Sequence, residues 1–292
     1  MASLFERSPD LLVVQGDTSS ALGGALAASS ANVPVAHVEA GLRTYDPLLP
    51  WPEEEYRTAI DAIADLMFAP TEIAAANLAA EKVAGKIHVT GNTAIDALLE
   101  TISSLPPFRR APRSIPRVLV TCHRRESWRE GLGTIADAIG ELAAARMASF
   151  EVVLHPNAHV AEHMRRSLGG KLGVTLVDAC SHRELLIRMR DSDLVLSDSG
   201  GIQEEAPALG VPLLVLRDKT ERPEGVATGS ARLVGTDRDR IVAEIRGLLC
   251  DPNSLAAMRR TSFPYGDGRA AARIASITAA WIEQRSLTCR LA

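Results

Sequence analysis

The sequence predicts an α/β fold made of two Rossmann-like domains with parallel sheets and a ligand cleft between them. Short β-branched or leucine-rich runs alternate with longer segments of helical period, as in parallel strands joined by crossover helices. The 292 residues exceed the roughly 150 residues of an average domain. A stretch from Leu105 to Arg117 contains four prolines and four arginines and cannot continue a helix, so it separates the domains. We therefore expect domains at 1–110 and 111–266, and a C-terminal helix within 267–292 that crosses back to the first domain.

The first domain is expected to hold four strands, each followed by a turn and then a helix or loop. They are predicted at Leu11–Gln15, Pro34–Val38, Leu66–Ala69 and Ile87–Thr90. Because a strand begins almost at the start of the chain and the second domain offers five strands, we expect this domain to be incomplete.

The second domain repeats the same rhythm. Its strands are predicted at Val118–Thr121, Val152–His155, Val174–Val177, Leu194–Ser197 and Leu213–Leu216. Two helices are marked by apolar stripes at helical spacing, which predict core positions. The stripes consist of Leu132, Ile135, Ile139 and Leu142, and of Ile241, Val242, Ile245, Leu248 and Leu249.

Composition and charge exclude several classes of protein. With 32 Lys and Arg against 36 Asp and Glu, the formal charge of −4 provides no basic field for a nucleic-acid partner. No apolar run approaches the roughly 18 residues of a membrane span, and the first residues lack the apolar core of a signal peptide. We expect a cytoplasmic protein without a membrane partner. The four cysteines lie far apart, which argues against a disulfide framework and a zinc cluster.

Polar side chains follow successive elements of the first domain. Asp17 comes after the first strand, and Glu39 and Arg43 flank a glycine turn after the second. Glu53 opens a predicted helix whose first position is Pro52. A helix cap, a local ion pair and compensation of the helix dipole explain these residues separately. Together, three carboxylates at one sheet edge could supply general acid and base groups.

The second domain offers groups that suit an anion. His123 and Arg124 follow its first strand and can present an imidazole and a guanidinium, although a solvated charged loop is the alternative. Ser199 and Gly200 form a turn between a strand and a helix, where backbone N–H groups and the helix dipole favour phosphate over a simple capped turn. Arg222 lies in a charged segment that faces the expected cleft.

His155 ends the second strand of this domain, and His159 and His163 follow at intervals of four residues. Pro156 and Asn157 interrupt any helix between the first two histidines. We therefore expect no metal site and keep His155 as a ligand-binding candidate.

Several segments of the chain, taken in order, resemble one family. They read QGDTSSA, HVEAGLRT, WPEEEYR, FAPTE, VTGNTAIDAL, CHRRESW, HPN, DSGGIQEEAPALGVPLLVLRDKTERPEG and YGDGRA. From Pro9 to Ala270 this set resembles the non-hydrolysing UDP-N-acetylglucosamine 2-epimerases of bacteria. The resemblance implies a glycosyltransferase-B-like fold that binds UDP-N-acetylglucosamine or UDP between its domains. It implies conversion to UDP-N-acetylmannosamine by elimination of UDP and readdition through 2-acetamidoglucal, without a cofactor or metal.

Carried over by position, the resemblance implies roles for particular residues. Asp17, Glu39 and Glu53 match the family's three important acids, and His123 matches its histidine near the phosphates. Ser199 and Gly200 match the phosphate-binding turn and Glu205 the carboxylate that holds the ribose. With these we group the remaining candidates for substrate binding: Arg43, Arg124, His155 and Arg222.

The chain departs from the family at two places. Ser127 stands where the family usually has Asn, and no segment matches the family's N-terminal strand and Gly-Thr-Arg-Pro-Glu loop. We therefore expect weak or no epimerase activity from residues 1–292 alone. A glycosyltransferase of the same architecture and a non-catalytic UDP-sugar-binding protein are the alternatives. The spaced glutamates of retaining transferases are absent, since Pro212 and Leu213 occupy the second position. The oligomeric state is open, with a homodimer as one alternative.

Overall fold

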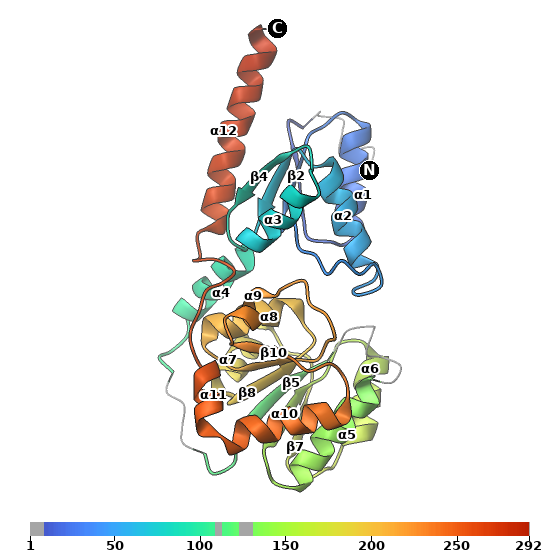
Figure 1. Cartoon of the computed structure of the whole chain (residues 1–292), viewed down its shortest axis with the longest axis vertical. Coiled ribbons are helices and arrows are strands. Elements are labelled where there is room, and N and C mark those ends of the chain that lie inside the picture. The colour runs from blue at the N-terminus through green and yellow to red at the C-terminus, as the bar shows by residue number, and fades with distance from the viewer. Residues whose placement is uncertain (1–8, 109–112, 123–130, 292) are drawn as a thin grey trace. The chain divides into compact units, whose positions relative to one another are not determined.

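The computed structural model describes residues 9–108, 113–122 and 131–291, which form two compact units (Figure 1). Unit 1 comprises Met1–Leu99 and Tyr265–Ala292, and unit 2 comprises Glu100–Pro264. The division falls within helix α4 (Thr93–Ser103). Whether each unit has the role expected from the sequence stays a prediction.

Unit 1 contains a parallel sheet of four strands in the order β1-β2-β3-β4. The strands are β1 (Leu12–Gln15), β2 (Val35–Val38), β3 (Leu66–Ala69) and β4 (Lys86–Val89). Besides the first part of α4, its helices are α1 (Ser19–Ser30), α2 (Glu53–Ile63), α3 (Glu72–Ala80) and α12 (Ala270–Leu291).

Both faces of the unit 1 sheet are covered, which explains why its central strands, β2 and β3, are buried along their whole length. Met67 and Ala69 of β3 pack in one core cluster with small and aliphatic residues of α1, α2 and α3. Leu66 and Phe68 point to the opposite face, where Ile274, Ile277 and Trp281 of α12 pack against them. The last helix therefore belongs to the core of unit 1, although it is distant in sequence.

The first turn of α12 is fixed by a neighbouring helix. The carboxylate of Asp96 in α4 accepts hydrogen bonds from the backbone of Ala270, at 3.1 Å, and of Ala271, at 2.7 Å. The preceding turn approaches the loop after β4 so closely that a Cβ on Gly91 would lie 3.1 Å from the Cα of Gly266. This contact gives the glycines of the VTGN and YGDG segments a structural reason.

Unit 2 contains a parallel sheet of six strands in the order β10-β9-β8-β5-β6-β7. The strands are β5 (Arg117–Thr121), β6 (Ser149–Val153), β7 (Val174–Val177), β8 (Leu194–Ser197), β9 (Leu213–Val215) and β10 (Ala231–Leu233). Its helices are α5 (Gly131–Ala144), α6 (Ala158–Leu168), α7 (His182–Asp191), α8 (Gly200–Leu209), α9 (Glu224–Ala227), α10 (Arg238–Cys250) and α11 (Pro252–Met258).

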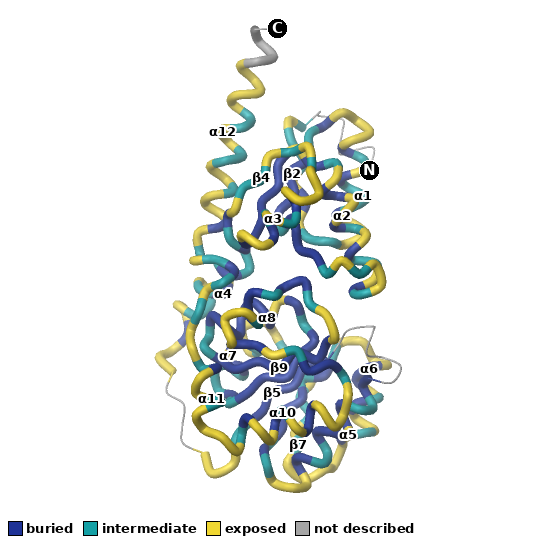
Figure 2. Tube along the Cα trace, in the orientation of Figure 1, coloured by how far each residue is buried: buried dark blue, intermediate teal, exposed yellow. Residues whose placement is uncertain are grey.

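The unit 2 sheet has the strand order of a doubly wound dinucleotide-binding fold. Its first strand, β5, is central and pairs with β6 on one side and β8 on the other. The chain thus reverses direction across the sheet between β5 and β8, the point at which such folds bind ligands beyond the carboxyl ends of the strands. Figure 2 shows the strands buried between more exposed helices.

The predicted α/β class with parallel sheets is confirmed, and most strands lie within one or two residues of their expected bounds. Two details were wrong. The strand expected at Val152–His155 is β6 (Ser149–Val153), because pairing with β5 begins at Ser149. The short edge strand β10 was missed. Among the described residues, no helix combines the length and apolar character required to cross a membrane.

Candidate functional site

Asp17 and Glu39 lie at the same edge of the unit 1 sheet, after β1 and β2. Gly16 separates β1 from Asp17 and has a φ of +67°, and a Cβ there would lie only 3.4 Å from Glu39 Oε2. Glu39 itself has a φ of +72°, a backbone conformation that is costly for a side chain with a Cβ. Two carboxylates at one edge of a sheet, one of them on strained backbone, are typical of a functional site.

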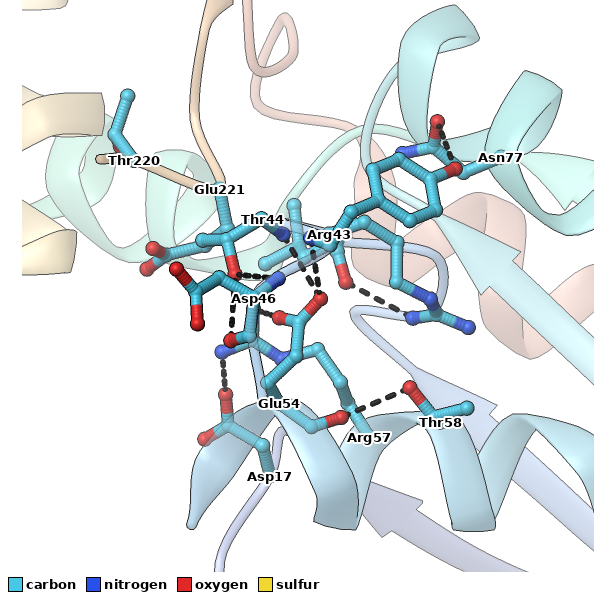
Figure 3. Close-up of polar contacts among 12 residues, drawn as sticks. Asp17, Arg43, Thr44, Asp46, Glu54, Arg57, Thr58, Asn77, Thr220 and Glu221 are labelled. Carbon is cyan, nitrogen blue, oxygen red and sulfur yellow. Dashed lines mark hydrogen bonds and ion pairs between the residues drawn. The ribbon is translucent and has the colours of Figure 1, made fainter. Parts of the chain in front are cut away.

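Helix α2 supplies the cation that binds Asp17. The guanidinium of Arg57, which is buried, pairs with Asp17 and with Glu54 (Figure 3). Thr18, rather than Asp17, caps α1, since its Oγ1 accepts a hydrogen bond from Ala21 N at 3.1 Å. The Asp17 carboxylate is therefore directed to Arg57 and has no part in capping the helix.

The three consecutive glutamates of the WPEEEYR segment have different surroundings. Glu53 is half-buried and is the first residue of α2, which begins one residue later than expected because Pro52 is the N-cap. Glu54 is buried, and its Oε1 accepts hydrogen bonds from the backbone of Thr44 and Tyr45, both at 2.9 Å (Figure 3). Glu55 is exposed. Glu54 thus holds the loop after β2, and Glu53 remains the catalytic candidate of the three.

A buried network supports this loop from inside unit 1. His37 of β2 places Nδ1 2.6 Å from Asp61 Oδ1 and Nε2 3.0 Å from the carbonyl oxygen of Gly16. The other oxygen of Asp61 accepts a hydrogen bond from Gly41 N at 3.1 Å. The network therefore connects the backbone beside Asp17 to the turn that follows Glu39.

Arg43 completes the buried network. Its guanidinium lies 2.8 Å from Asp61 and donates two hydrogen bonds of 2.7 Å to Glu81. Burial disfavours the charged guanidinium, but the hydrogen bonds and charges of Glu81 and Asp61 outweigh it and raise the pKa of Arg43. These partners give Arg43 a structural role, and its expected contact with substrate stays a prediction.

Asn92 was not among the sequence candidates. It follows β4, is buried, and places Nδ2 3.4 Å from Glu39 Oε1, a long contact. Its Oδ1 accepts a hydrogen bond from Ala94 N at 3.0 Å, which orients the amide. Arg57 lies in the first turns of α2, within the WPEEEYR segment, and Asn92 follows β4, within the VTGNTAIDAL segment. These positions in segments quoted for the resemblance were the signal that the sequence offered.

A cavity of about 260 Å³ lies at the switch point of the unit 2 sheet. Thr121 Oγ1 and Ser197 Oγ lie 2.6 Å apart at the ends of β5 and β8, and Ser197 Oγ accepts a hydrogen bond from Ser199 N at 3.0 Å. The cavity is lined by residues from the ends of the strands and the starts of α7 and α8, among them Cys122, His155, Cys180, His182, Ser199 and Glu205. We call this the unit 2 cavity.

Ser199 is the N-cap residue of α8, and Gly200 is its first residue. The Ser199 side chain makes no capping hydrogen bond within the described residues. The first-turn N–H groups of a helix have no partner within the helix, so this turn can accept an anion. Arg222 lies beside it, since a Cβ on Gly200 would be 2.8 Å from Arg222 Nη1. Arg222 also pairs with Glu204, at 2.6 Å, and with Glu221.

The structure thus brings together Asp17 and Glu39 in unit 1, and His155, Ser199 and Glu205 in unit 2, with Gly200 and Arg222 at the same turn. His123 and Arg124 fall outside the described residues. Nowhere in 9–108, 113–122 and 131–291 do three His, Cys, Asp or Glu residues gather in a way that could hold a metal ion.

Comparisons with known proteins match nearly the whole chain. The family profile described as UDP-N-acetylglucosamine 2-epimerase matches residues 2–279. The UDP-N-acetylglucosamine 2-epimerase of Escherichia coli K12 is 44% identical over 287 residues, which cover 93% of this chain and 76% of that protein.

Two solved structures are also similar. The UDP-GlcNAc 2-epimerase of Neisseria meningitidis bound to UDP-GlcNAc has a TM-score of 0.90 at 38% identity, covering 96% of this chain and 78% of that one. The S. aureus MnaA structure with UDP has a TM-score of 0.89 at 36% identity, covering 97% and 78%.

Proposed function

The chain belongs to the UDP-N-acetylglucosamine 2-epimerase family, and we propose that it interconverts UDP-N-acetylglucosamine and UDP-N-acetylmannosamine. The observation that carries this proposal is the pair of carboxylates, Asp17 and Glu39, at one edge of the unit 1 sheet. Unit 2 supplies the nucleotide site and unit 1 the groups that move protons. Relatives solved with UDP-GlcNAc and with UDP support this substrate class.

The reaction requires a base and an acid for one carbon atom. A carboxylate takes the proton from C2 of the sugar while the C1–O bond breaks and its electron pair leaves with UDP. A C1=C2 double bond remains in 2-acetamidoglucal. UDP then adds back to C1, and a proton is returned to the opposite face of C2. Asp17, Glu39 and Glu53 are the candidates for these proton transfers.

The departing UDP gains negative charge that the protein must stabilise. The first turn of α8 offers backbone N–H groups and the positive end of the helix dipole beside Ser199 and Gly200. Arg222 adds a guanidinium at the same turn. In the proposal these groups hold the phosphates, and Glu205 accepts the ribose hydroxyls.

The proposal includes a cytoplasmic location. The thiols of Cys122, Cys180 and Cys250 are free, which is compatible with that location.

The test is conversion of UDP-N-acetylglucosamine in D2O, followed by proton NMR, which records the anomeric signals and the loss of the C2 proton signal as deuterium replaces that proton. In a form of the protein that converts the substrate measurably, Asp17→Asn and Glu39→Gln should each lower kcat by about 100-fold or more, the usual contribution of acid–base catalysis, with smaller effects on UDP affinity. Glu55→Gln is the matched control, because Glu55 lies two residues from Glu53 and is exposed.

Turnover close to wild type in both variants would remove the two carboxylates from the mechanism. UDP binding without conversion or exchange at C2 would instead favour the non-catalytic alternative, and transfer of the sugar to an added acceptor would favour a glycosyltransferase.

A further inference from the structure

The unit 2 cavity contains an imidazole to which neither the sequence pattern nor the proposed mechanism assigns a role. His182 is the first residue of α7, and its Nε2 lies 2.7 Å from Oε1 of Glu205 in α8. Both residues line the cavity of about 260 Å³. This hydrogen bond thus joins the two helices at the wall of the candidate nucleotide site.

The backbone that carries His182 is fixed by a capping box. Ser181 Oγ accepts a hydrogen bond from Glu184 N at 3.3 Å, and Glu184 Oε2 accepts one from Ser181 N at 2.8 Å. A reciprocal cap of this kind satisfies two helix-end donors and sets the direction of the first turn. His182 therefore approaches Glu205 from a defined position, even though nearly half of its side chain is exposed.

The buried carboxylate of Glu205 needs a hydrogen-bond donor such as His182. The residue is 7% exposed, and its burial raises the pKa of the carboxyl group, while the hydrogen bond and charge of His182 counteract that shift. A carboxylate that accepts a donor on Oε1 can turn only a limited distance about its last torsion. The orientation of Oε2 is then set by His182.

We propose that His182 is a positioning residue for nucleotide recognition, which holds the Glu205 carboxylate so that Oε2 accepts the ribose hydroxyls of UDP. The inference rests on the proposed function, in which Glu205 binds the ribose. In this proposal His182 does not contact the reacting atoms of the N-acetylhexosamine. It increases the binding preference for a nucleotide with ribose hydroxyls over one that lacks them.

The experiment compares equilibrium dissociation constants for UDP and for 2′,3′-dideoxyuridine diphosphate, measured by calorimetry without any turnover. The two ligands share base and diphosphate, so the ratio of their constants isolates the ribose hydroxyls. In the wild type this ratio should be about 10 or more, as for hydrogen bonds to a charged group. In His182→Ala it should fall to within about twofold of unity, because Glu205 loses its orientation.

A pair of amide variants separates positioning from a general loss of structure. The Nε2 of Gln reaches about as far as the Nε2 of His, whereas the amide of Asn is one bond shorter. His182→Gln should therefore keep the preference for UDP, and His182→Asn should lose it. His159→Ala is a control, because His159 is an exposed histidine near the start of α6 and outside the cavity.

A wild-type ratio in His182→Ala, or equal ratios in the Gln and Asn variants, would overturn the inference and leave the proposed function intact. Failure of the wild-type protein to bind UDP at all would overturn both. Loss of the preference in His159→Ala as well would show that the effect does not depend on His182, and would also overturn the inference.

Discussion

Gly200 is the residue with the least room at the turn that we assign to the phosphates. A Cβ at this position would lie 2.8 Å from Nη1 and 3.0 Å from Cζ of Arg222. Gly200→Val should therefore displace the Arg222 guanidinium and obstruct the approach of a diphosphate to the start of α8. We expect UDP affinity, measured by calorimetry, to fall by about tenfold or more, as for the loss of one charge-assisted hydrogen bond.

The neighbouring glycine provides the control for this prediction. A Cβ on Gly201 would meet nothing closer than Ser199 Oγ at 4.0 Å. Gly201→Ala should consequently leave UDP affinity within about twofold of wild type. If Gly200→Val bound UDP as tightly as Gly201→Ala does, the phosphates would have to lie at another place.

Some residues of the site could be anticipated from the sequence and others could not. Asp17, Glu39 and Ser199 each follow a recognisable strand, and the ends of parallel strands share one edge of a sheet. The partners of Arg57 and His182 could not be anticipated in this way, because these partners, Asp17 and Glu205, are 40 and 23 residues away in the chain. Only the packing of α2 and α7 brings these groups together.

At the scale of elements, α12 is the part whose contribution to stability is most readily tested. Trp281, Ile274 and Ile277 are half-buried against the face of β2 and β3 that carries Ala36, Val38, Leu66 and Phe68. Trp281→Ala removes a large apolar contact from this face. Since the side chain is only partly buried, the free energy of unfolding of unit 1 should fall by less than the roughly 3–5 kcal/mol of a fully buried Trp, about 1–3 kcal/mol.

Calorimetry measures the unfolding temperatures of the protein. Cleavage by a protease at sites within one unit or the other shows which unit unfolds in each transition. The unfolding transition of unit 1 should move to lower temperature in Trp281→Ala, while the transition of unit 2 stays in place. Glu283→Ala tests the specificity of this effect, because Glu283 is exposed on the same helix. Equal shifts in both variants, or a shift confined to unit 2, would contradict the assignment of α12 to the core of unit 1.

Strand positions were largely predictable, and the exceptions have physical reasons. The predicted positions of β3, β7 and β8 coincide with the observed strands. β3 and β8 are buried along their whole length, which favours a nearly continuous apolar run. β10 has only three residues, Ala231–Leu233, and pairs with β9 alone, so its pattern was too short to detect. The start of β6 was displaced because register with β5, a non-local feature, includes Ser149.

For the molecule as a whole, Asp61 should contribute to the pH dependence of stability. Burial opposes ionisation of this carboxyl, but the hydrogen bond and charge of His37, with the charge of Arg43, outweigh it and lower its pKa below 3.8. A depressed pKa in the folded state gives stability that is fully present above 3.8 and is lost as pH falls through the lower, folded value.

We therefore expect the thermal midpoint of unit 1 to drop between pH 5 and pH 3, in part because of Asp61. Asp61→Asn should be less stable at pH 5, by about 3 kcal/mol or more, as when one partner of a buried pair is removed. It should also lose less stability on acidification. Scans at the two pH values measure both effects.

Asp178→Asn is a suitable comparison, because Asp178 makes an exposed pair with Arg165. It should follow the wild-type pH dependence. A wild-type pH dependence in Asp61→Asn as well would show that Asp61 does not contribute to the acid sensitivity of unit 1.

By itself the sequence determined the α/β class, the strand positions and the family, because these depend on local periodicity and on ordered segments such as QGDTSSA and DSGGIQEE. The tertiary structure decided which charged groups serve the site and which support it. Glu53, Glu54 and Glu55 are equivalent as sequence, yet one starts α2, one holds the loop after β2 and one is exposed. The same is true of Arg43 and Arg57, since the partner of a buried charge is chosen by packing between elements distant in the chain.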